Sequence, residues 1–354
     1  MQEQLSKAGT VSRSRRFALA CSCCLLLLLT FSSAAFAQGG AWARQRSGTM
    51  AWLHAVFFLD QNRGWVVGSK GSLLHTSDGG NTWTARSGST EDVVRDIFFI
   101  DDQNGWMVCE VNAYQLKTKE EPRAYLMKTT DGGDHWKRVE IKGFDIDSVL
   151  VRAVFSSKGR GWTFGDAGQI YTTKDAGNTW VALRSPTSYL LLGGIFVDDD
   201  RGWLVGAGAT IIQTSDGGDT WYQSNLPQVE KSVRFTATTF ADNRRGWAVG
   251  SSGSVFRTLN GGRTWERQQS TVDVDLFDVK FVNAVEGWAV GAEGAIIHTS
   301  DGGEHWTTER SGTPHPLERV FFSDRNHGWA VGFGGTVVSY LRPEASATRQ
   351  RRSQ

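Results

Sequence analysis

The sequence has few cysteines, few prolines and no excess of charge of one sign. Its 354 residues include 4 Cys and 6 Pro, and 38 Lys and Arg face 37 Asp and Glu. This balance argues against nucleic-acid binding, which usually shows as a basic patch or a strongly basic domain. Three of the cysteines lie within residues 21–24, so a chain that loses this segment keeps only Cys109. Without a possible internal disulfide, its core must stabilise the fold, and we expect Cys109 to be a small apolar residue in a strand.

Long apolar runs are also scarce, and the clearest one lies near the N-terminus. Basic residues precede FALACSCCLLLLLTF, and SSAAFAQGG follows it. This pattern predicts a signal peptide over residues 1–37, with cleavage after Ala37 and export of the rest. An uncleaved membrane anchor is an alternative, although the run is shorter than the ~20 residues that span a bilayer. Two other routes stay open: a twin-arginine signal at Arg15–Arg16 and a lipoprotein signal at Cys21.

Tryptophan and glycine are abundant, with 15 Trp and 41 Gly. The dipeptide Gly-Trp recurs, and its spacing is 41 residues in four of six intervals, 44 in one and 56 in another. Its tryptophans are Trp65, Trp106, Trp162, Trp203, Trp247, Trp288 and Trp329. Each opens a similar segment, of which GWVVGSKGSLLHTSDGGNTW is the first. Self-similarity at this period is the mark of a repeat architecture.

Each repeat is expected to form four short strands. Apolar stretches alternate with turns rich in Gly, Asp and Asn, as in LHAVFFLD, GWVVGS, SLLHTS and TWTARS of the first copy. A four-stranded unit of ~40 residues is the size of one propeller blade. The prediction is an all-β, seven-bladed propeller of antiparallel four-stranded blades over residues 38–341. A basic, disordered tail is expected over residues 342–354.

The two ends of the repeat array complement each other. The seventh copy, GWAVGFGGTVVSYL, stops before its fourth strand, while AWARQRSGTM at 41–50 matches a fourth strand with Trp42 in the place of Trp83. We therefore expect the N-terminal strand to complete the last blade and close the ring, which removes exposed sheet edges. This arrangement leaves Trp52 as the one tryptophan outside the pattern.

The string S/T-x-D-x-G-x-T-W is similar to the Asp-box, or bacterial neuraminidase repeat. The full unit GWxVGxxGxIxxTxDGGxTW resembles the photosystem II stability/assembly factor family, over roughly residues 41–340. That resemblance implies a seven-bladed propeller of the thylakoid lumen or bacterial periplasm, acting as a non-enzymatic scaffold for a protein partner. In a phototroph the partner would be a newly made reaction-centre protein.

The repeated acidic turn is interpreted as scaffolding. One carboxylate per blade cannot converge on a substrate, whereas Asp in a turn accepts its own backbone N–H groups and Gly supplies positive φ. The tryptophan after the turn is expected to cover the blade core. The residues so assigned are Asp78, Trp83, Asp131, Trp136, Asp175, Trp180, Asp216, Trp221, Asn260, Trp265, Asp301 and Trp306.

An enzyme is the alternative from another class. An Asp-box glycoside hydrolase or glycan-binding protein would place a pair of axial carboxylates beside exposed aromatic residues. The chain lacks an F-R-I-P-like motif of sialidases, and its histidines are scattered over different blades at variable positions. We therefore predict no catalytic residues, no metal site and no cofactor.

Partner binding is expected where the repeats differ. Arg95, Arg152, Arg234 and Arg319 lie at or just before the innermost strand of four blades. They could gather at one mouth of the central channel, and the resembled family has an arginine-rich patch that binds its partner. Such a patch would bind carboxylates by bidentate contacts. Their differing registers leave open that they are unrelated solvated charges.

The insertion of about 15 residues in the second repeat is a second candidate, because loops often carry function. It could offer Tyr114, Lys117 and Tyr125 to a partner, or be a tolerated long loop. We expect a monomer, at most peripheral to a membrane, that binds a protein partner such as a membrane-protein segment and no nucleic acid.

Overall fold

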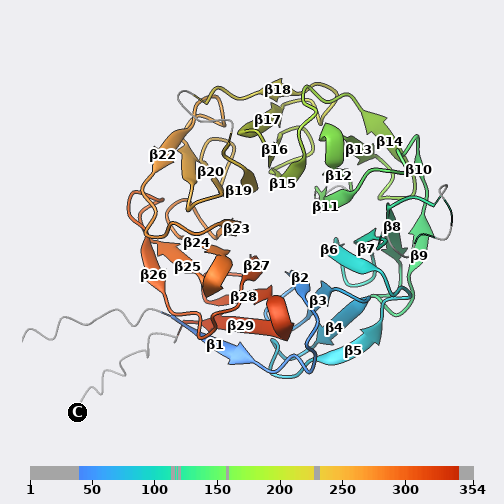
Figure 1. The fold of residues 1–354 in the computed structure, drawn as a ribbon, viewed down its shortest axis with the longest axis horizontal. Coiled ribbons are helices and arrows are strands. Elements are labelled where there is room, and N and C mark those ends of the chain that lie inside the picture. Colours follow the sequence, from blue (N-terminus) through green and yellow to red (C-terminus); the bar gives the residue numbers. More distant parts are fainter. Residues whose placement is uncertain are drawn as a thin grey trace, which may run out of the picture. The chain divides into compact units, whose positions relative to one another are not determined.

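Seven β-sheets are arranged in a ring in the computed structural model (Figure 1). The structure describes residues 40–112, 116, 118, 121–156, 159–226 and 232–342. The predicted signal peptide and nearly all of the predicted tail lie outside the described residues. Within this part, each inner strand contacts the inner strand of the next blade, and β27 contacts β2, so the ring is closed.

The blades follow one another in chain order, each with its first strand innermost. Blade one holds β2 (Leu53–Phe58), β3 (Gly64–Gly68), β4 (Ser72–Thr76) and β5 (Thr84–Ser87); blade two holds β6 (Val93–Phe99), β7 (Gly105–Glu110), β8 (Ala124–Thr129) and β9 (Lys137–Val139). Blade three holds β11 (Leu150–Phe155), β12 (Gly161–Gly165), β13 (Ile170–Thr173) and β14 (Trp180–Leu183); blade four holds β15 (Leu191–Phe196), β16 (Gly202–Gly206), β17 (Thr210–Thr214) and β18 (Tyr222–Gln223).

The remaining three blades repeat the arrangement. Blade five holds β19 (Phe235–Phe240), β20 (Gly246–Gly250), β21 (Val255–Thr258) and β22 (Glu266–Gln268); blade six holds β23 (Leu276–Phe281), β24 (Gly287–Gly291), β25 (Ile296–Thr299) and β26 (Thr307–Glu309). Blade seven holds β27 (Leu317–Phe322), β28 (His327–Gly332), β29 (Thr336–Leu341) and β1 (Ala41–Gln45). The helical turns are η2 (Asp166–Gly168), η3 (Ala292–Gly294) and η4 (Phe333–Gly335). None of the described helices is long and apolar enough to cross a membrane.

The N-terminal strand closes the ring as predicted. Strand β1 pairs antiparallel with β29, and Trp42 lies opposite Tyr340. The Trp42 ring packs edge-on against Phe322, at 5.8 Å between centroids and 87° between planes. The seven-bladed, antiparallel prediction is therefore confirmed, with one addition in blade three. There the short strand β10 (Ile141–Lys142) pairs parallel with β14 and makes a fifth strand.

The repeated tryptophans hold neighbouring blades together through one phenylalanine. Each inner strand ends in Phe, and in blade six Phe281 stacks on Trp247 of blade five at 3.4 Å between centroids. Trp306 of the same blade packs edge-on against Phe281, with 5.9 Å between the ring centroids. Aromatic pairs in these geometries add stability beyond the area they bury. The stacked pairs are Trp329–Phe58, Trp65–Phe99, Trp106–Phe155, Trp162–Phe196, Trp203–Phe240, Trp247–Phe281 and Trp288–Phe322.

The glycine of Gly-Trp is required by this same phenylalanine. A Cβ added to Gly287 would lie 2.4 Å from Cδ2 of Phe281, and the equivalent glycine of every blade meets its own inner-strand Phe as closely. A distance below 3.0 Å would force the ring out of the stack. In the Gly-Trp dipeptide, the glycine therefore leaves room for the Phe of its own blade, and the indole of the tryptophan stacks on the Phe of the next blade.

Candidate functional site

A β-bulge at the same position of every inner strand shapes one mouth of the channel. Each inner strand shifts register after its first paired residue, or after its second in β6, so that one residue is left unpaired. A bulge redirects the side chain of the extra residue. We call these residues the channel-mouth ring, and they are His54, Arg95, Val151, Leu192, Thr236, Phe277 and Glu318.

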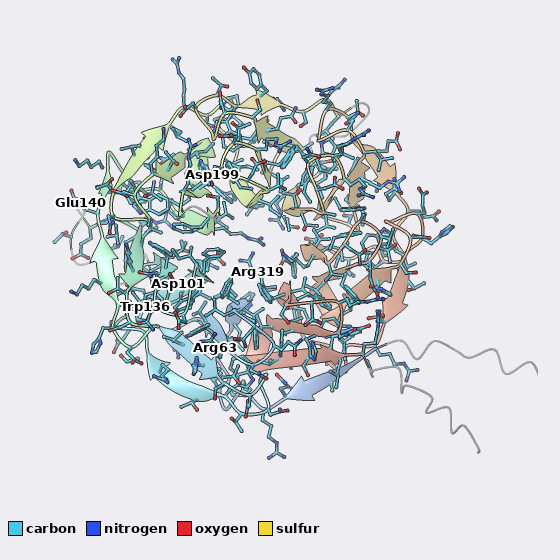
Figure 2. The ribbon with its side chains drawn as sticks, turned by 180° about the vertical axis from the view of Figure 1, so that it is seen from behind. Arg63, Asp101, Trp136, Glu140, Asp199 and Arg319 are labelled. Carbon is cyan, nitrogen blue, oxygen red and sulfur yellow. The ribbon has the colours of Figure 1, made fainter. Side chains whose placement is uncertain are left out.

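All members of the channel-mouth ring line a single cavity of about 260 Å³. Because the cavity takes one residue from each of seven inner strands, it lies on the axis of the ring, at the end where these strands begin. Arg152, Arg234 and Arg319 complete its lining. Figure 2 shows Arg319 near the centre of the ring, whereas Glu140 lies at its outer edge.

The structure thus brings all four predicted arginines to one cavity. Arg95 occupies the bulge itself, Arg152 and Arg319 lie one residue further along their strands, and Arg234 directly precedes β19. Their registers differ, as the sequence indicated, yet the side chains converge. Their role in partner binding stays a prediction.

Two of these arginines belong to buried ion pairs between distant blades. Arg152 of blade three donates to Asp278 of blade six from both terminal nitrogens, at 3.3 Å each. Arg319 of blade seven donates to Asp96 of blade two at 3.4 Å. All four side chains are nearly buried. These two pairs span the axis and close the floor of the cavity.

The second oxygen of each buried carboxylate connects neighbouring inner strands. The N–H of Val320 donates to Asp278 at 3.0 Å, and the N–H of Ala153 donates to Asp96 at 3.1 Å. Four blades are thereby linked in a closed circuit of charged side chains and backbone groups. In the described structure both oxygens of each carboxylate have a partner inside the protein.

The position directly after the bulge holds the four charged residues of these ion pairs in blades two, three, six and seven. In the other three blades the residue at this position is small. It holds Ala55, Gly193 and Ala237 in blades one, four and five. Short side chains here leave the axis open for two guanidinium groups, which could not lie there beside seven large residues. The distribution of large and small residues at this position therefore decides which blades are tied across the channel.

The other two arginines face solvent. Arg95 contacts Glu110 at 2.6 Å and Arg234 contacts Asp275 at 3.5 Å, and the two arginine side chains are 39% and 49% exposed. Exposed ion pairs are worth little, typically 0–1 kcal/mol, because water and salt screen them. Arg234 can therefore exchange Asp275 for a carboxylate of a ligand at modest cost, and the exposed part of Arg95 can contact a ligand beside Glu110.

The charge state of the lining follows from burial. Burial, together with the charge of Arg95, lowers the pKa of His54 to about 4, so this ring is neutral at physiological pH. Burial raises the pKa of Asp96 to about 6 despite Arg152 and the Ala153 N–H, and the group is still ionised at pH 7. Burial also raises the pKa of Glu318, against a hydrogen bond from Trp52.

The channel-mouth ring has an apolar side and a polar side. Blades three, four and six contribute Val151, Leu192 and Phe277 to the cavity, while blades seven and two contribute Glu318 and Arg95. A ligand that fits this lining would combine an acidic group with apolar surface. Ligand sites are commonly apolar with a few placed polar groups, and this cavity follows that pattern.

Sequence reasoning missed most of this ring because it compared arginines with one another and did not compare one register position across all seven blades. Every ring member stands eleven residues before the tryptophan of its Gly-Trp, and the axis position that holds Asp96 and Asp278 stands ten before it. Counting back from Gly-Trp would have found His54, Phe277 and Glu318 as well. The signal was present, but it needed the knowledge that this position points to the axis.

The insertion in blade two is described in part. Tyr114 and Lys117 lie outside the described residues. Tyr125 belongs to β8 and is buried, and its hydroxyl donates to Asp92 at 2.7 Å while Arg138 covers its ring at 4.2 Å. Tyr125 is therefore a residue of a strand and not of the inserted loop. A partner-binding role for the three residues stays a prediction.

The DGG-type turns have one geometry in all six blades that carry them. In the first, Asp78 accepts the N–H of Thr82 at 2.9 Å and the hydroxyl of Thr76 at 2.8 Å. The same two bonds occur at Asp131, Asp175, Asp216, Asn260 and Asp301.

The following tryptophans are buried except Trp83, which is partly exposed. Trp136, Trp180, Trp221, Trp265 and Trp306 are the five buried ones. The acidic side chains are engaged within their own turns and do not converge. Among the described residues, no group of three or more His, Cys, Asp and Glu side chains is arranged to hold a metal ion.

Comparison with known proteins gives one family match and many structural matches. The family model described as "Photosynthesis system II assembly factor YCF48" matches residues 34–183, 182–271 and 266–341. No curated protein matches the sequence.

Among solved structures, "YCF48 bound to D1 peptide" has 21% identity and a TM-score of 0.69, covering 88% of this chain and 100% of that chain. YCF48 from Cyanidioschyzon merolae has 20% identity and a TM-score of 0.69, covering 85% and 99%. Virginiamycin B lyase from Staphylococcus aureus has 12% identity and a TM-score of 0.71, covering 85% and 99%. At these identities the structural matches show the fold alone.

Proposed function

The chain belongs to the photosynthesis system II assembly factor YCF48 family, and on that premise we propose that it is a non-enzymatic scaffold that binds an acidic protein segment at the channel mouth. One observation carries the proposal: arginines from four different blades line one cavity. A related protein has been solved with a bound D1 peptide, which supports a peptide as the ligand class.

Arg95 and Arg234 are the two residues assigned to the ligand. Their side chains are 39% and 49% exposed, whereas Arg152 and Arg319 are nearly buried and paired with buried carboxylates. A guanidinium binds a carboxylate through two parallel hydrogen bonds, which gives orientation as well as energy. The inner pairs hold the floor of the cavity, and the outer arginines receive the ligand.

The test is binding of a labelled D1 peptide by the purified protein, followed by fluorescence anisotropy. We expect the Arg95→Gln/Arg234→Gln double variant to bind at least about tenfold more weakly, since losing charge-assisted contacts costs 1.4 kcal/mol or more. The matched control is Arg201→Gln/Arg245→Gln. These arginines are equally exposed and also paired with aspartates, but they lie in the turns between first and second strands.

Each outcome of this experiment decides the proposal. Equal weakening in both double variants would indicate a general charge effect and would contradict a defined site. Unchanged binding in Arg95→Gln/Arg234→Gln, with an unchanged thermal melting temperature, would place the peptide elsewhere. Failure of the wild-type protein to bind the D1 peptide would reject a D1-like partner.

A second candidate is a glycan-active protein, because a partly buried carboxyl lies beside an exposed indole. Burial raises the pKa of Glu318, and Trp52 donates to it from Nε1 at 3.0 Å. A carboxyl with a raised pKa can act as a general acid in glycoside hydrolysis. Release of reducing sugar from a polysaccharide panel, abolished in Glu318→Gln, would favour this candidate over the scaffold.

The cellular location is also part of the proposal. The charged N-terminus, apolar run and small-residue site favour export of the propeller after cleavage at Ala37. The destination would be the periplasm, or the thylakoid lumen in a phototroph. Mass spectrometry of the mature N-terminus tests this, and an intact N-terminus on the accumulated protein would contradict it. We further infer that the DGG-type turns are Asp-boxes with a structural role.

A further inference from the structure

A group of exposed apolar side chains lies beside the channel mouth, at the junction of blades seven and one. Trp52 is 41% and Phe333 45% exposed. We call Trp52 and Phe333, with the neighbouring His315, the aromatic shelf. Trp52 is also the tryptophan that the repeat pattern leaves unexplained.

Ring contacts run from the cavity to the outer end of the shelf. The Trp52 ring lies 5.4 Å from the ring of His54, a member of the channel-mouth ring, measured between centroids. It also packs edge-on against Phe333, with 5.4 Å between centroids and 82° between ring planes. His315 follows at 5.7 Å from Phe333. The aromatic shelf is therefore continuous with the lining of the cavity.

The backbone holds the two halves of the shelf in place. Phe333 belongs to η4, the red coil beside β28 and β29 in Figure 1. The N–H of Phe333 donates to the carbonyl of Pro316, and the N–H of Gly335 donates to the carbonyl of Ala51. These bonds tie the turn of blade seven to the segment that enters blade one.

A residue of the cavity lining holds the indole of Trp52 in place. Its Nε1 donates to Glu318, which lines the cavity together with Arg95 and Arg234. A tryptophan held by a hydrogen bond loses little entropy on binding and presents a large rigid surface. Aromatic residues and Met are enriched in the cores of protein interfaces, and Trp is a frequent hot spot.

We propose that the aromatic shelf binds a large apolar side chain of the same segment whose acidic group enters the cavity. This inference rests on the proposed function and names the sequence class of the ligand: an extended peptide with Asp or Glu and a nearby aromatic or aliphatic residue. The positive charge of Arg95 and Arg234 in the cavity lining selects the acidic group. The shelf selects the apolar one.

A peptide fits the shelf better than a sugar does. Trp52 and Phe333 meet edge-on, so they form a corner that can enclose a side chain rather than one flat platform for a sugar ring. The Trp52 N–H is already engaged by Glu318 and is not free for a sugar hydroxyl.

The experiment is selection of random displayed heptapeptides on the purified protein. We expect enriched peptides to share an acidic residue and a large apolar residue at a constant spacing. A synthetic peptide of the enriched sequence should bind Trp52→Ala and Phe333→Ala about tenfold more weakly, as expected for loss of a hot spot. Trp52→Phe keeps the ring but loses the bond to Glu318, and it should fall between wild type and Trp52→Ala.

Tyr222→Ala is the matched control, since Tyr222 is an aromatic residue 60% exposed on an outer strand of blade four. It should leave binding unchanged. Acidic peptides without an apolar preference, or unchanged binding in both shelf variants, would overturn the shelf and leave the proposed function standing. No enriched peptide would overturn both. Glycan-array binding that is lost in Trp52→Ala would identify a sugar as the occupant and also overturn the peptide.

Discussion

The DGG-type turns and the channel-mouth ring both take equivalent positions from successive blades, but they differ in how much the residue at that position changes from blade to blade. The turns repeat nearly one residue and one hydrogen-bond pattern from blade one to blade six. The ring holds seven different amino acids at one register. A position that repeats serves every blade alike, whereas a position that varies on the axis can form one asymmetric site.

The aromatic stack is expected to give the largest effect on stability. Phe281→Ala removes a ring held between Trp247 and Trp306 and should lower the free energy of unfolding by about 4 kcal/mol. Phe277→Ala in the same strand is the control, because that ring lines the cavity and is partly exposed, and it should cost clearly less. Urea denaturation measures both. Equal costs would remove the distinction between repeated and variable positions.

The buried ion pairs are expected to give the second-largest effect on stability. Asp278→Ala leaves the Arg152 charge buried and the Val320 N–H without its acceptor, and should cost about 3 kcal/mol. The double variant Arg152→Met/Asp278→Leu removes both charges and should cost less than the single change. Chemical denaturation of the three proteins decides this. A double variant as unstable as Asp278→Ala would mean that the pair itself stabilises the ring.

The repeated turn predicts a smaller effect that depends on pH. Burial acts in the opposite direction, but hydrogen bonds from Thr179 and Thr173 lower the pKa of Asp175 to about 2, from 3.8. Its contribution is therefore complete above about pH 5 and is lost as pH falls from 4 toward 2. Asp175→Asn should cost about 1 kcal/mol at pH 7 and should abolish this turn's acid sensitivity.

Blade five supplies the natural control for that experiment. Asn260 makes the same backbone bond as the aspartates, accepting the N–H of Thr264 at 3.0 Å. Asn260→Asp should add acid sensitivity of the same sign, measured as the slope of unfolding free energy between pH 2 and 5. Slopes that do not change in either variant would show that the turn carboxylates do not contribute to acid unfolding.

The smallest effect on stability is expected at the outer arginines. Arg234→Gln removes a half-exposed contact with Asp275 and should change the unfolding free energy by less than about 0.5 kcal/mol. Arg245→Gln, with equal exposure and an aspartate partner, should behave alike in thermal melts. A much larger loss in Arg234→Gln would give this residue a structural role and weaken its assignment to ligand binding.

Most of the fold could be predicted because its information is local. The Gly-Trp spacing gives the blade period, turn residues mark strand ends, and the missing fourth strand of the last repeat points to Trp42. The fifth strand of blade three was not predicted. Its short strand at Ile141 lies in the link that follows β9 of blade two, and it pairs with β14 through tertiary placement.

The site could be predicted in part. The four arginines were found from their place near the first strands, and they do share a cavity. Their buried partners were not found, because Arg152 and Asp278 are 126 residues apart in sequence, and Arg319 and Asp96 are 223 apart. Nothing in either local sequence indicates which blade faces which across the axis.

The sequence by itself determined the number of blades, the order of strands, the closure by the N-terminal strand and the turn chemistry, because each depends on short segments repeated along the chain. Tertiary structure alone decided that one bulged residue per blade meets on the axis, that two ion pairs cross it, and that Trp52 joins Phe333 beside it. Ring closure brings distant segments to one axis, and only there do differences between repeats become a site.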